Sequence, residues 1–158
     1  MMKKSRSHCP ISFALDLFGD RWTLLILRDV MLKNKYRFQD LLACEEKIAT
    51  NVLADRLRKL EAYGILSKTD DPDSGRQFRY APTPKGLDLL PVLLEIIRWS
   101  GRHDPRTAAP REFLRRLERD TDGLYAALRQ PFTPSRRSTS HSATRHSTTR
   151  HATTRREQ

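Results

Sequence analysis

The most informative segment of this chain is Ile48-Ala-Thr-Asn-Val-Leu-Ala-Asp-Arg-Leu-Arg-Lys-Leu60. Its leucines Leu53, Leu57 and Leu60 recur at helical spacing, so they predict the buried face of a helix over about residues 50–63. Gly64 follows directly and is placed to stop that helix. With the leucines turned inward, a rotation of about 100° per residue turns a polar face outward. That face consists of Thr50 at the N-terminal end, Asn51, Asp55, Arg58 and Lys59.

The outward side chains have the chemistry of DNA recognition. Asparagine pairs with adenine through two hydrogen bonds, arginine pairs with guanine, and threonine contacts a phosphate or a thymine methyl group. The alternative is an ordinary amphipathic helix with a solvated charged face, and the helix alone does not distinguish the two. The residues we predict to contact DNA here are Thr50, Asn51, Arg58 and Lys59.

Three further helices are predicted upstream. Residues 10–18 repeat apolar side chains at helical spacing, and residues 21–32 are apolar on most sides, which predicts a buried central helix. A basic break and a short helix at 38–44 follow. Residues 38–44 and 50–63 then form a predicted helix-turn-helix, in which the second helix enters the major groove and the first crosses the DNA backbone.

A hairpin is predicted downstream. Residues 65–69 and 76–81 indicate two strands, joined by the turn-rich segment 70–75. This composition is typical of a basic wing, and it shifts the interpretation of the preceding helix towards DNA binding. The polar side chains that give the hairpin its character are Lys68, Arg76, Gln77 and Arg79.

The remaining chain divides into a long helix, an extension and a tail. Thr83 and Pro84 predict the start of a long amphipathic helix, in which Pro91 marks a start adjustment or a kink. After a linker, residues 111–129 predict one charged helix with a weak point at 120–123. The sequence therefore predicts a mainly α fold with a small β-hairpin wing, a winged helix-turn-helix. Its expected parts are a DNA-binding and dimerisation domain at 1–104, a helical extension at 105–130 and a disordered basic tail at 131–158.

The charge of the chain makes a polyanion the first partner to consider. The formal net charge is +11 and the pI is about 10.3. The tail at 131–158 contains six Arg and one Glu, with repeats of the type Ser/Ala-x-Thr-Arg-His/Arg. Since no run approaches the ~18 apolar residues of a spanning helix, a membrane is the weaker expectation and we predict a cytoplasmic protein.

Other functional classes find little support. The sequence has no Gly-rich phosphate loop, no zinc-binding helix motif and no nucleophile signature with a paired base. Two cysteines without metal-ligand spacing form neither a disulfide framework nor a metal site. We therefore expect no enzyme, no cofactor and no metal. The alternative that stays open is a sequence-independent nucleic-acid-binding protein that acts through its basic tail.

Several blocks of the sequence resemble the HxlR-type regulators. The similarity spans roughly residues 8–103, and its specificity comes from many blocks in the right order and spacing. The blocks are Cys9-Pro-Ile11, Gly19-Asp-Arg-Trp-Thr23, Leu27-Arg-Asp29, Arg37-Phe38, Ile48 to Leu57, Leu60-Glu61, Gly64-Ile65, Thr83-Pro-Lys-Gly86, Leu90-Pro-Val-Leu93 and Trp99.

The resemblance implies a winged-helix homodimer that represses or activates a nearby gene. Two recognition helices related by a two-fold axis then predict a near-palindromic operator on double-stranded DNA. It implies that Arg76 and Arg79 approach a phosphate or the minor groove. One departure is Pro82, which stands where an apolar strand residue is usual and predicts an early end of the second strand. An effector ligand is not specified. The predicted dimer-interface residues are Ile11, Phe18, Leu94, Ile97 and Trp99.

Two single residues carry separate expectations. Cys9 precedes the first helix among basic groups, a placement that favours the thiolate, and some regulators of the resembled family sense oxidants with such a cysteine. The alternative is an inert structural thiol. Arg56 falls beside the inward face of its helix, so we expect a structural salt bridge with Asp29 or Glu61 rather than a base contact.

Overall fold

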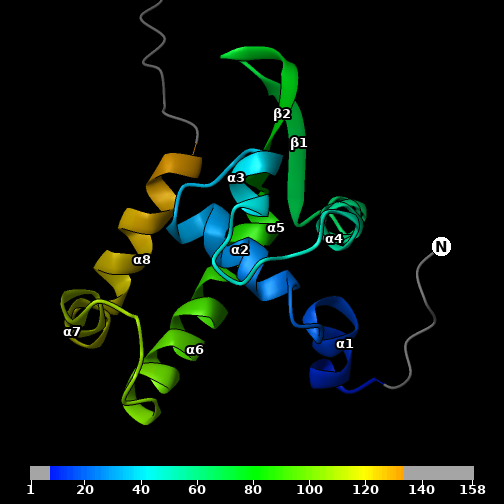
Figure 1. Cartoon of the computed structure of the whole chain (residues 1–158). Coiled ribbons are helices and arrows are strands. Elements are labelled where there is room, and N and C mark those ends of the chain that lie inside the picture. The colour runs from blue at the N-terminus through cyan, green and yellow to red at the C-terminus, as the bar shows by residue number, and fades with distance from the viewer. Residues whose placement is uncertain (1–7, 134–158) are drawn as a thin grey trace, which may run out of the picture.

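The computed structural model describes residues 8–133 and shows helices around one core, with a two-stranded hairpin projecting from it (Figure 1). Of the predicted disordered tail, residues 134–158 lie outside the described residues, whereas its expected start is corrected, because Pro131 and Phe132 belong to a short 3-10 helix. The elements are α1 (Pro10–Phe18), α2 (Thr23–Leu32), α3 (Phe38–Leu42), α4 (Thr50–Ala62), β1 (Leu66–Asp71), β2 (Ser74–Pro82), α5 (Pro84–Leu87), α6 (Leu90–His103), α7 (Arg111–Arg119), α8 (Thr121–Arg129) and the 3-10 helix η1 (Gln130–Phe132).

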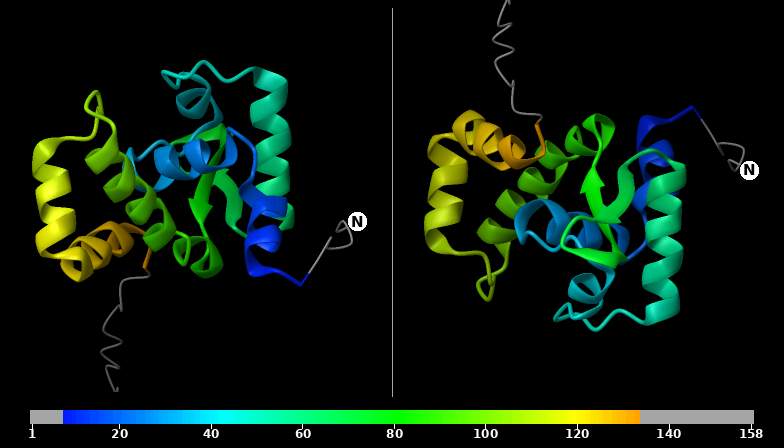
Figure 2. Two further views of the ribbon diagram at one scale, coloured as in Figure 1. Left: turned by 90° about the horizontal axis from the view of Figure 1, so that it is seen from below. Right: turned by 90° about the horizontal axis from the view of Figure 1, so that it is seen from above.

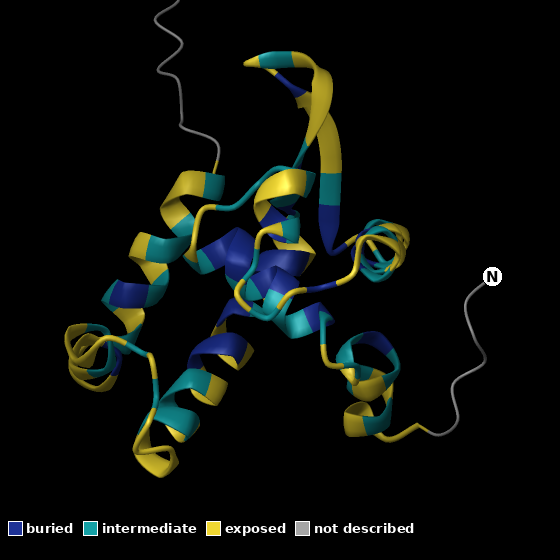
Figure 3. Cartoon of the chain, viewed as in Figure 1, coloured by how far each residue is buried: buried dark blue, intermediate teal, exposed yellow. Residues whose placement is uncertain are grey.

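Helix α2 is the centre of the core, as its apolar sequence predicts (Figure 3). Leu27 and Val30 are fully buried, and α2 packs against α1, α3, α6 and β2. The start of α2 is fixed by Asp20, whose Oδ1 accepts hydrogen bonds from the backbone N–H groups of Trp22 (2.8 Å) and Thr23 (3.0 Å). These bonds satisfy amides that a helix leaves without partners in its first turn.

Helices α3 and α4 form the predicted helix-turn-helix. Leu53, Leu57 and Leu60 are almost completely buried, so the inward face of α4 is confirmed. The chain leaves α4 through Gly64, whose φ of +65° lies in the left-handed region that glycine adopts without strain. The strand that follows consequently turns back and packs against α4.

Strands β1 and β2 form the wing, an antiparallel hairpin in which Leu66 pairs with Pro82 and Asp70 with Phe78. The register shifts between Asp70 and Asp71, next to the turn. The expected early end of the second strand is wrong, because β2 continues through Pro82. Proline is tolerated there because it occupies the last position of a two-stranded sheet, where no third strand needs its missing N–H group.

The predicted long helix after Thr83 is divided into α5 and α6. Thr83 caps α5, since its Oγ1 accepts a hydrogen bond from the backbone N–H of Gly86 (3.1 Å). The interruption at 88–89 places Pro91 in the first turn of α6, where its missing N–H group costs no helical hydrogen bond. Pro91 therefore marks a start adjustment, one of the two outcomes expected, and not a kink.

The extension is also divided. Asp120 ends α7 and caps α8, because its Oδ1 accepts from the backbone N–H of Gly123 (2.9 Å). The single helix expected over 111–129 is therefore broken at its predicted weak point. Leu117 and Leu124 are buried, and α7 packs against α6, so the extension covers one side of α6. Figure 2 shows α7 and α8 on the opposite side of the molecule from α4.

Within residues 8–133, none of the helices combines the length and the apolar composition that are needed to cross a bilayer. The same part of the chain contains no group of three or more His, Cys, Asp or Glu side chains arranged to hold a metal ion.

Candidate nucleic-acid interface

The outward face of α4 carries three of its four predicted DNA-contacting residues in exposed positions. Thr50 and Asn51 lie in the first turn, and the side chain of Arg58 is 76% exposed. The residue before the helix is Ala49, which has no side-chain oxygen to cap it, so the first amides of α4 are left for water or an anion. The only described partner of Arg58 within ion-pair range among residues 8–133 is Asp55, at 3.8 Å.

Lys59 does not belong to this face. Its Nζ donates a hydrogen bond to the backbone oxygen of Asp16 on α1 (2.9 Å), so its prediction as a DNA contact is corrected. The bond places the ammonium group at the end of α1, where it complements the carbonyl end of that helix. Lys59 therefore joins α4 to α1.

Arg56 has the structural role that its position predicts, with a different partner. Its Nη1 lies 3.4 Å from Oδ2 of Asp20, and neither Asp29 nor Glu61 pairs with it. Burial opposes ionisation of the Asp20 carboxyl, yet hydrogen bonds from Thr23 and from the backbone of Trp22 and Thr23 outweigh it, so the pKa of Asp20 is lowered. The ionised carboxylate thus caps α2 and holds α4.

An ion pair that sequence reasoning missed fixes the turn of the helix-turn-helix. Arg28 on α2 donates to both carboxylate oxygens of Glu46 (2.6 and 3.1 Å), and its Nε donates to Asp29 (2.7 Å). The bidentate bond with Arg28 lowers the pKa of Glu46 to about 2. An arginine within the buried helix was the available signal, because a charge there needs a partner.

The wing carries the predicted basic side chains, but its turn is acidic. Arg76 is exposed, and Arg79 is half-buried with its guanidinium 5.1 Å from the ring centre of Tyr36. Lys68 lies over the exposed ring of Phe78 at 4.0 Å. The end of β1 contains Asp70 and Asp71, and the turn after it contains Asp73; these carboxylates repel a phosphate backbone unless they are neutralised.

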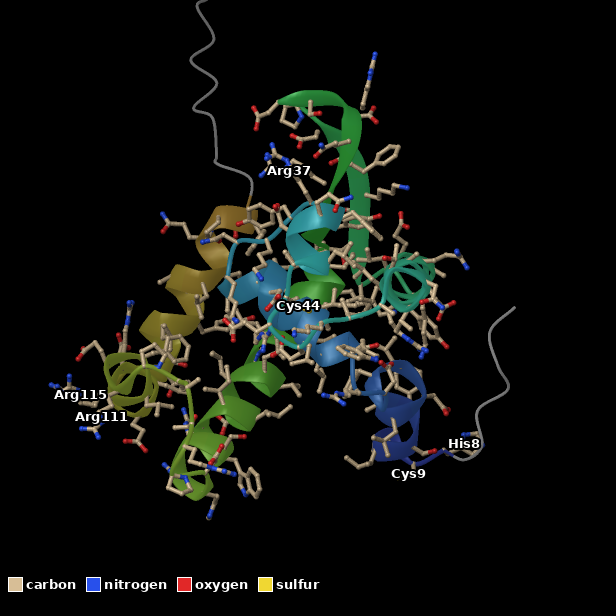
Figure 4. All side chains as sticks on the ribbon, viewed as in Figure 1. His8, Cys9, Arg37, Cys44, Arg111 and Arg115 are labelled. Carbon is tan, nitrogen blue, oxygen red and sulfur yellow. The ribbon has the colours of Figure 1, made fainter. Side chains whose placement is uncertain are left out.

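Arg37 neutralises two of these three carboxylates, a role that its basic character alone did not predict. It lies just before α3 and pairs with Asp71 and with Asp73 (3.2 Å), as its place beneath the wing in Figure 4 indicates. The hydrogen bond with Arg37 holds the pKa of Asp71 below its ordinary value. Arg37 also forms an isolated bridge with Arg79, so one residue ties the wing to the helix-turn-helix.

A second surface, of apolar residues, lies on α1 and α6. Of the predicted interface residues, Ile11 and Trp99 are each 66% exposed, whereas Phe18 and Ile97 are half-buried against the core. Leu94 is only 1% exposed, so it is a core residue of its own chain, and its prediction as an interface residue is corrected. We call the exposed set the α1–α6 apolar surface; it contains Ile11, Phe13, Leu15, Val92, Ile96 and Trp99.

The two cysteines are far apart in the fold (Figure 4). Cys9 is exposed and directly precedes α1, beside the exposed His8. Cys44 is half-buried and packs against the core. Cys9 is therefore the cysteine that an oxidant in solution can reach.

Comparison with known proteins identifies the family. The model of the HxlR-like helix-turn-helix family matches residues 17–108. An uncharacterized HTH-type transcriptional regulator of Synechocystis sp. is 34% identical over 86 residues, which cover 54% of this chain and 63% of that protein. The uncharacterized HTH-type transcriptional regulator YvaP of Bacillus subtilis is 32% identical over 93 residues, 58% of this chain and 85% of YvaP.

Solved structures support the same family assignment. PA1607 superposes with a TM-score of 0.60 at 32% identity and covers 68% of this chain and 75% of its own. The redox regulator HypR in its oxidized form gives a TM-score of 0.54 at 29% identity, and the match covers 60% of this chain and 96% of HypR. The reduced form of the transcriptional regulator YodB from B. subtilis gives a TM-score of 0.51 at 28% identity, and the match covers 64% of this chain and 99% of the YodB chain. The chain thus belongs to the HxlR-like helix-turn-helix family, whose members are DNA-binding transcriptional regulators and not enzymes.

Proposed function

We propose that this regulator binds a near-palindromic operator on double-stranded DNA as a homodimer. The observation that carries the proposal is the placement of two surfaces: the exposed face of α4 and the wing lie together, and the α1–α6 apolar surface lies at the end of the molecule opposite the wing (Figure 1). A dimer through that end leaves both recognition helices exposed. A two-fold axis then demands two half-sites about one helical turn apart.

The apolar surface supports a partner of the same kind. Trp99 and Ile96 line an open groove of about 490 Å³ on α6 with Pro91, Val92 and Glu95. Exposed apolar side chains on α1 and on α6, two helices that both pack against α2, exceed the scattered exposure of a monomer surface. A second copy of the chain offers the same surface, which is the self-complementary arrangement of a two-fold dimer.

The operator is tested by selecting duplexes from a random-sequence library with the full chain and footprinting the enriched sequence. We expect two inverted half-sites and two protected segments. Uniform protection without any preferred sequence would instead support the alternative, a sequence-independent nucleic-acid-binding protein.

A second proposal is that oxidation of Cys9 changes operator affinity. It is supported by the exposure of Cys9 at the start of α1, part of the proposed interface, and by the redox regulators among the similar structures. Two Cys9 thiols of a dimer would form one disulfide, giving two protons and two electrons to an oxidant such as diamide. A link there would reorient the α1 helices and so the recognition helices.

The test compares operator affinity and non-reducing gels before and after diamide treatment, for the wild type and Cys9→Ser. We expect a covalent dimer and an altered affinity only in the wild type. Cys44→Ser is the matched control and should behave as the wild type. Unchanged affinity on oxidation, with no dimer band that depends on Cys9, would make Cys9 a structural thiol.

A further inference from the structure

The end of the described chain packs against the base of the wing. In η1, the ring of Phe132 meets the ring of Tyr36 edge-on, with centroids 6.1 Å apart and planes at 81°. In this arrangement the positive edge of one ring meets the negative face of the other, which stabilises the pair beyond its apolar burial. Pro131 and Phe132 also line an open groove of about 360 Å³ together with residues of both strands, so the two segments adjoin.

Tyr36 is the residue through which this contact reaches the wing. Its backbone oxygen accepts a hydrogen bond from the backbone N–H of Tyr80 on β2 (2.8 Å), and its hydroxyl donates to Oδ1 of Asn34 (2.7 Å). The guanidinium carbon of Arg79 lies 5.1 Å from the centre of the same ring. Burial raises the pKa of Tyr36 and the charge of Arg79 opposes that rise, as expected for a ring that lies between the protein and a cation.

Arg79 depends on this ring for its orientation. Within residues 8–133, no carboxylate forms an ion pair with its guanidinium, and the carboxylate of Asp71 is paired with Arg37. An arginine side chain without a partner samples many rotamers and loses that freedom when it binds a phosphate. A guanidinium held on an aromatic ring has already lost part of it. The Tyr36 ring therefore lowers the entropy loss of a contact between Arg79 and a phosphate.

The extension fixes the position of Phe132. Leu117 on α7 and Leu124 on α8 are buried, and Arg129 at the end of α8 pairs with Asp88 directly after α5 (3.5 Å). Helices α7 and α8 thus return the chain from the far end of α6 to the wing (Figure 1). The matched family region ends at residue 108, so this return path lies beyond the family match.

We propose that Phe132 is a positioning residue for DNA binding: by packing on Tyr36, it holds that ring against Arg79 and keeps the guanidinium in one orientation before it meets a DNA phosphate. The inference rests on the proposed function and on the predicted contact of Arg79 with DNA. It gives the extension a role that is separate from sequence selection by α4. Because a phosphate contact carries no sequence information, Phe132 raises the affinity for all sequences alike.

The test is a double-mutant cycle in the full chain, made of the wild type, Phe132→Ala, Arg79→Ala and the double variant. Fluorescence anisotropy measures the affinity of each protein for an operator duplex and for a random-sequence duplex. We expect Phe132→Ala to weaken binding to both duplexes by about threefold per protomer, which is about tenfold for a dimer. In the Arg79→Ala background the same substitution should have no further effect, because the side chain that Phe132 orients is gone.

Two further variants separate positioning from a general loss of stability. The matched control is Phe113→Ala, which removes the same ring from α7, where it packs against the buried core. It should leave the affinity for DNA unchanged, and Phe132→Tyr, which keeps the ring, should bind as the wild type does. Urea unfolding shows which variants are folded under the binding conditions. In the DNA-free protein, 15N relaxation of Arg79 Nε should show greater mobility in Phe132→Ala than in the wild type or Phe113→Ala.

The cycle also shows how the inference can fail. A loss of affinity from Phe132→Ala that persists in full in the Arg79→Ala background would overturn it, since the ring would then act through another group. So would an equal loss from Phe113→Ala, an unchanged mobility of Arg79 Nε, or an Arg79→Ala protein that binds DNA as the wild type does. The proposed function is judged separately, by whether the wild type selects an operator with two inverted half-sites.

Discussion

At the scale of single residues, the cations of α4 divide into two groups. Arg58 projects into solvent, whereas Arg56 pairs with Asp20 and Lys59 donates to the end of α1. Spacing alone predicted the buried leucines, because a helical period fixes which positions face inward. It did not separate Lys59 from Arg58, because the position of α1 beside α4 is a tertiary feature.

Asn51 and Arg58 should determine sequence preference. Asn51→Ala or Arg58→Ala is expected to reduce discrimination between the operator and random DNA by about 1–3 kcal/mol, the worth of a bidentate base contact. Arg76→Ala or Arg79→Ala should weaken binding to all sequences alike and flatten the salt slope by about one unit. Competition titrations with operator and with random DNA measure both the discrimination and the general affinity. The reverse pattern would exchange the roles of α4 and the wing.

The Arg28–Glu46 pair should make the stability of the fold depend on pH in the acidic range. Glu46 is ionised above its ordinary pKa near 4.5 in both folded and unfolded chains, and in the folded chain it stays ionised down to about pH 2. The stabilisation is therefore complete above about pH 4.5 and is lost as the pH falls towards 2. Glu46→Gln should lower the free energy of unfolding by about 1 kcal/mol at pH 7. The same variant should show a flatter dependence of that free energy on pH in this window.

Urea unfolding at pH 7 and at pH 3 measures this effect. Glu45→Gln is the matched control, since its side chain is 86% exposed and its contact with Lys33 is at the 4.0 Å limit of an ion pair. A Glu46→Gln protein as stable as the wild type at pH 7 would show that the bidentate contact does not hold the turn.

At the scale of elements, the wing depends on a residue outside it. Arg37→Gln leaves Asp71 and Asp73 without their cation, while the backbone bridge between residues 37 and 79 still joins the wing to the segment before α3. We expect weaker binding to operator and random DNA alike, because an uncompensated acidic turn repels phosphate. Fluorescence anisotropy with an operator duplex and with a random-sequence duplex measures the loss of affinity. Restored affinity in the triple variant Arg37→Gln, Asp71→Asn, Asp73→Asn would identify charge as the cause; a loss confined to the operator would argue against this role.

Sequence patterns predicted the elements better than their ends and partners. The hairpin, α4 and the inward helices follow from local periodicity and turn residues. The ion pair between Arg37 and Asp71 could not be predicted, because 34 positions separate the two residues in sequence and only the fold brings them together. The end of β2 at Pro82 was missed for a related reason, because the outcome depended on whether a third strand would need its N–H group.

At the scale of the whole molecule, association through the α1–α6 apolar surface should be sensitive to a charge placed in it. Ile96→Glu is expected to shift the proposed dimer towards monomer, because a carboxylate on this face would lose its hydration in an apolar contact. Sedimentation equilibrium at micromolar concentration measures the change. The matched control is Phe78→Glu on the wing, also exposed and apolar, which should leave the dimer intact. A wild type that stayed monomeric would contradict the proposed interface.

The exposure of Trp99 also has an optical consequence. The chain has two tryptophans: Trp99 is 66% exposed on the α1–α6 apolar surface, whereas Trp22 is half-buried against the core. An indole that leaves water for an apolar contact emits at shorter wavelength, so association would shift the fluorescence of the unlabelled protein. In a Trp22→Phe background this emission would come from the interface alone. Dimer formation could then be followed in real time, in the presence of unlabelled DNA and without any attached dye.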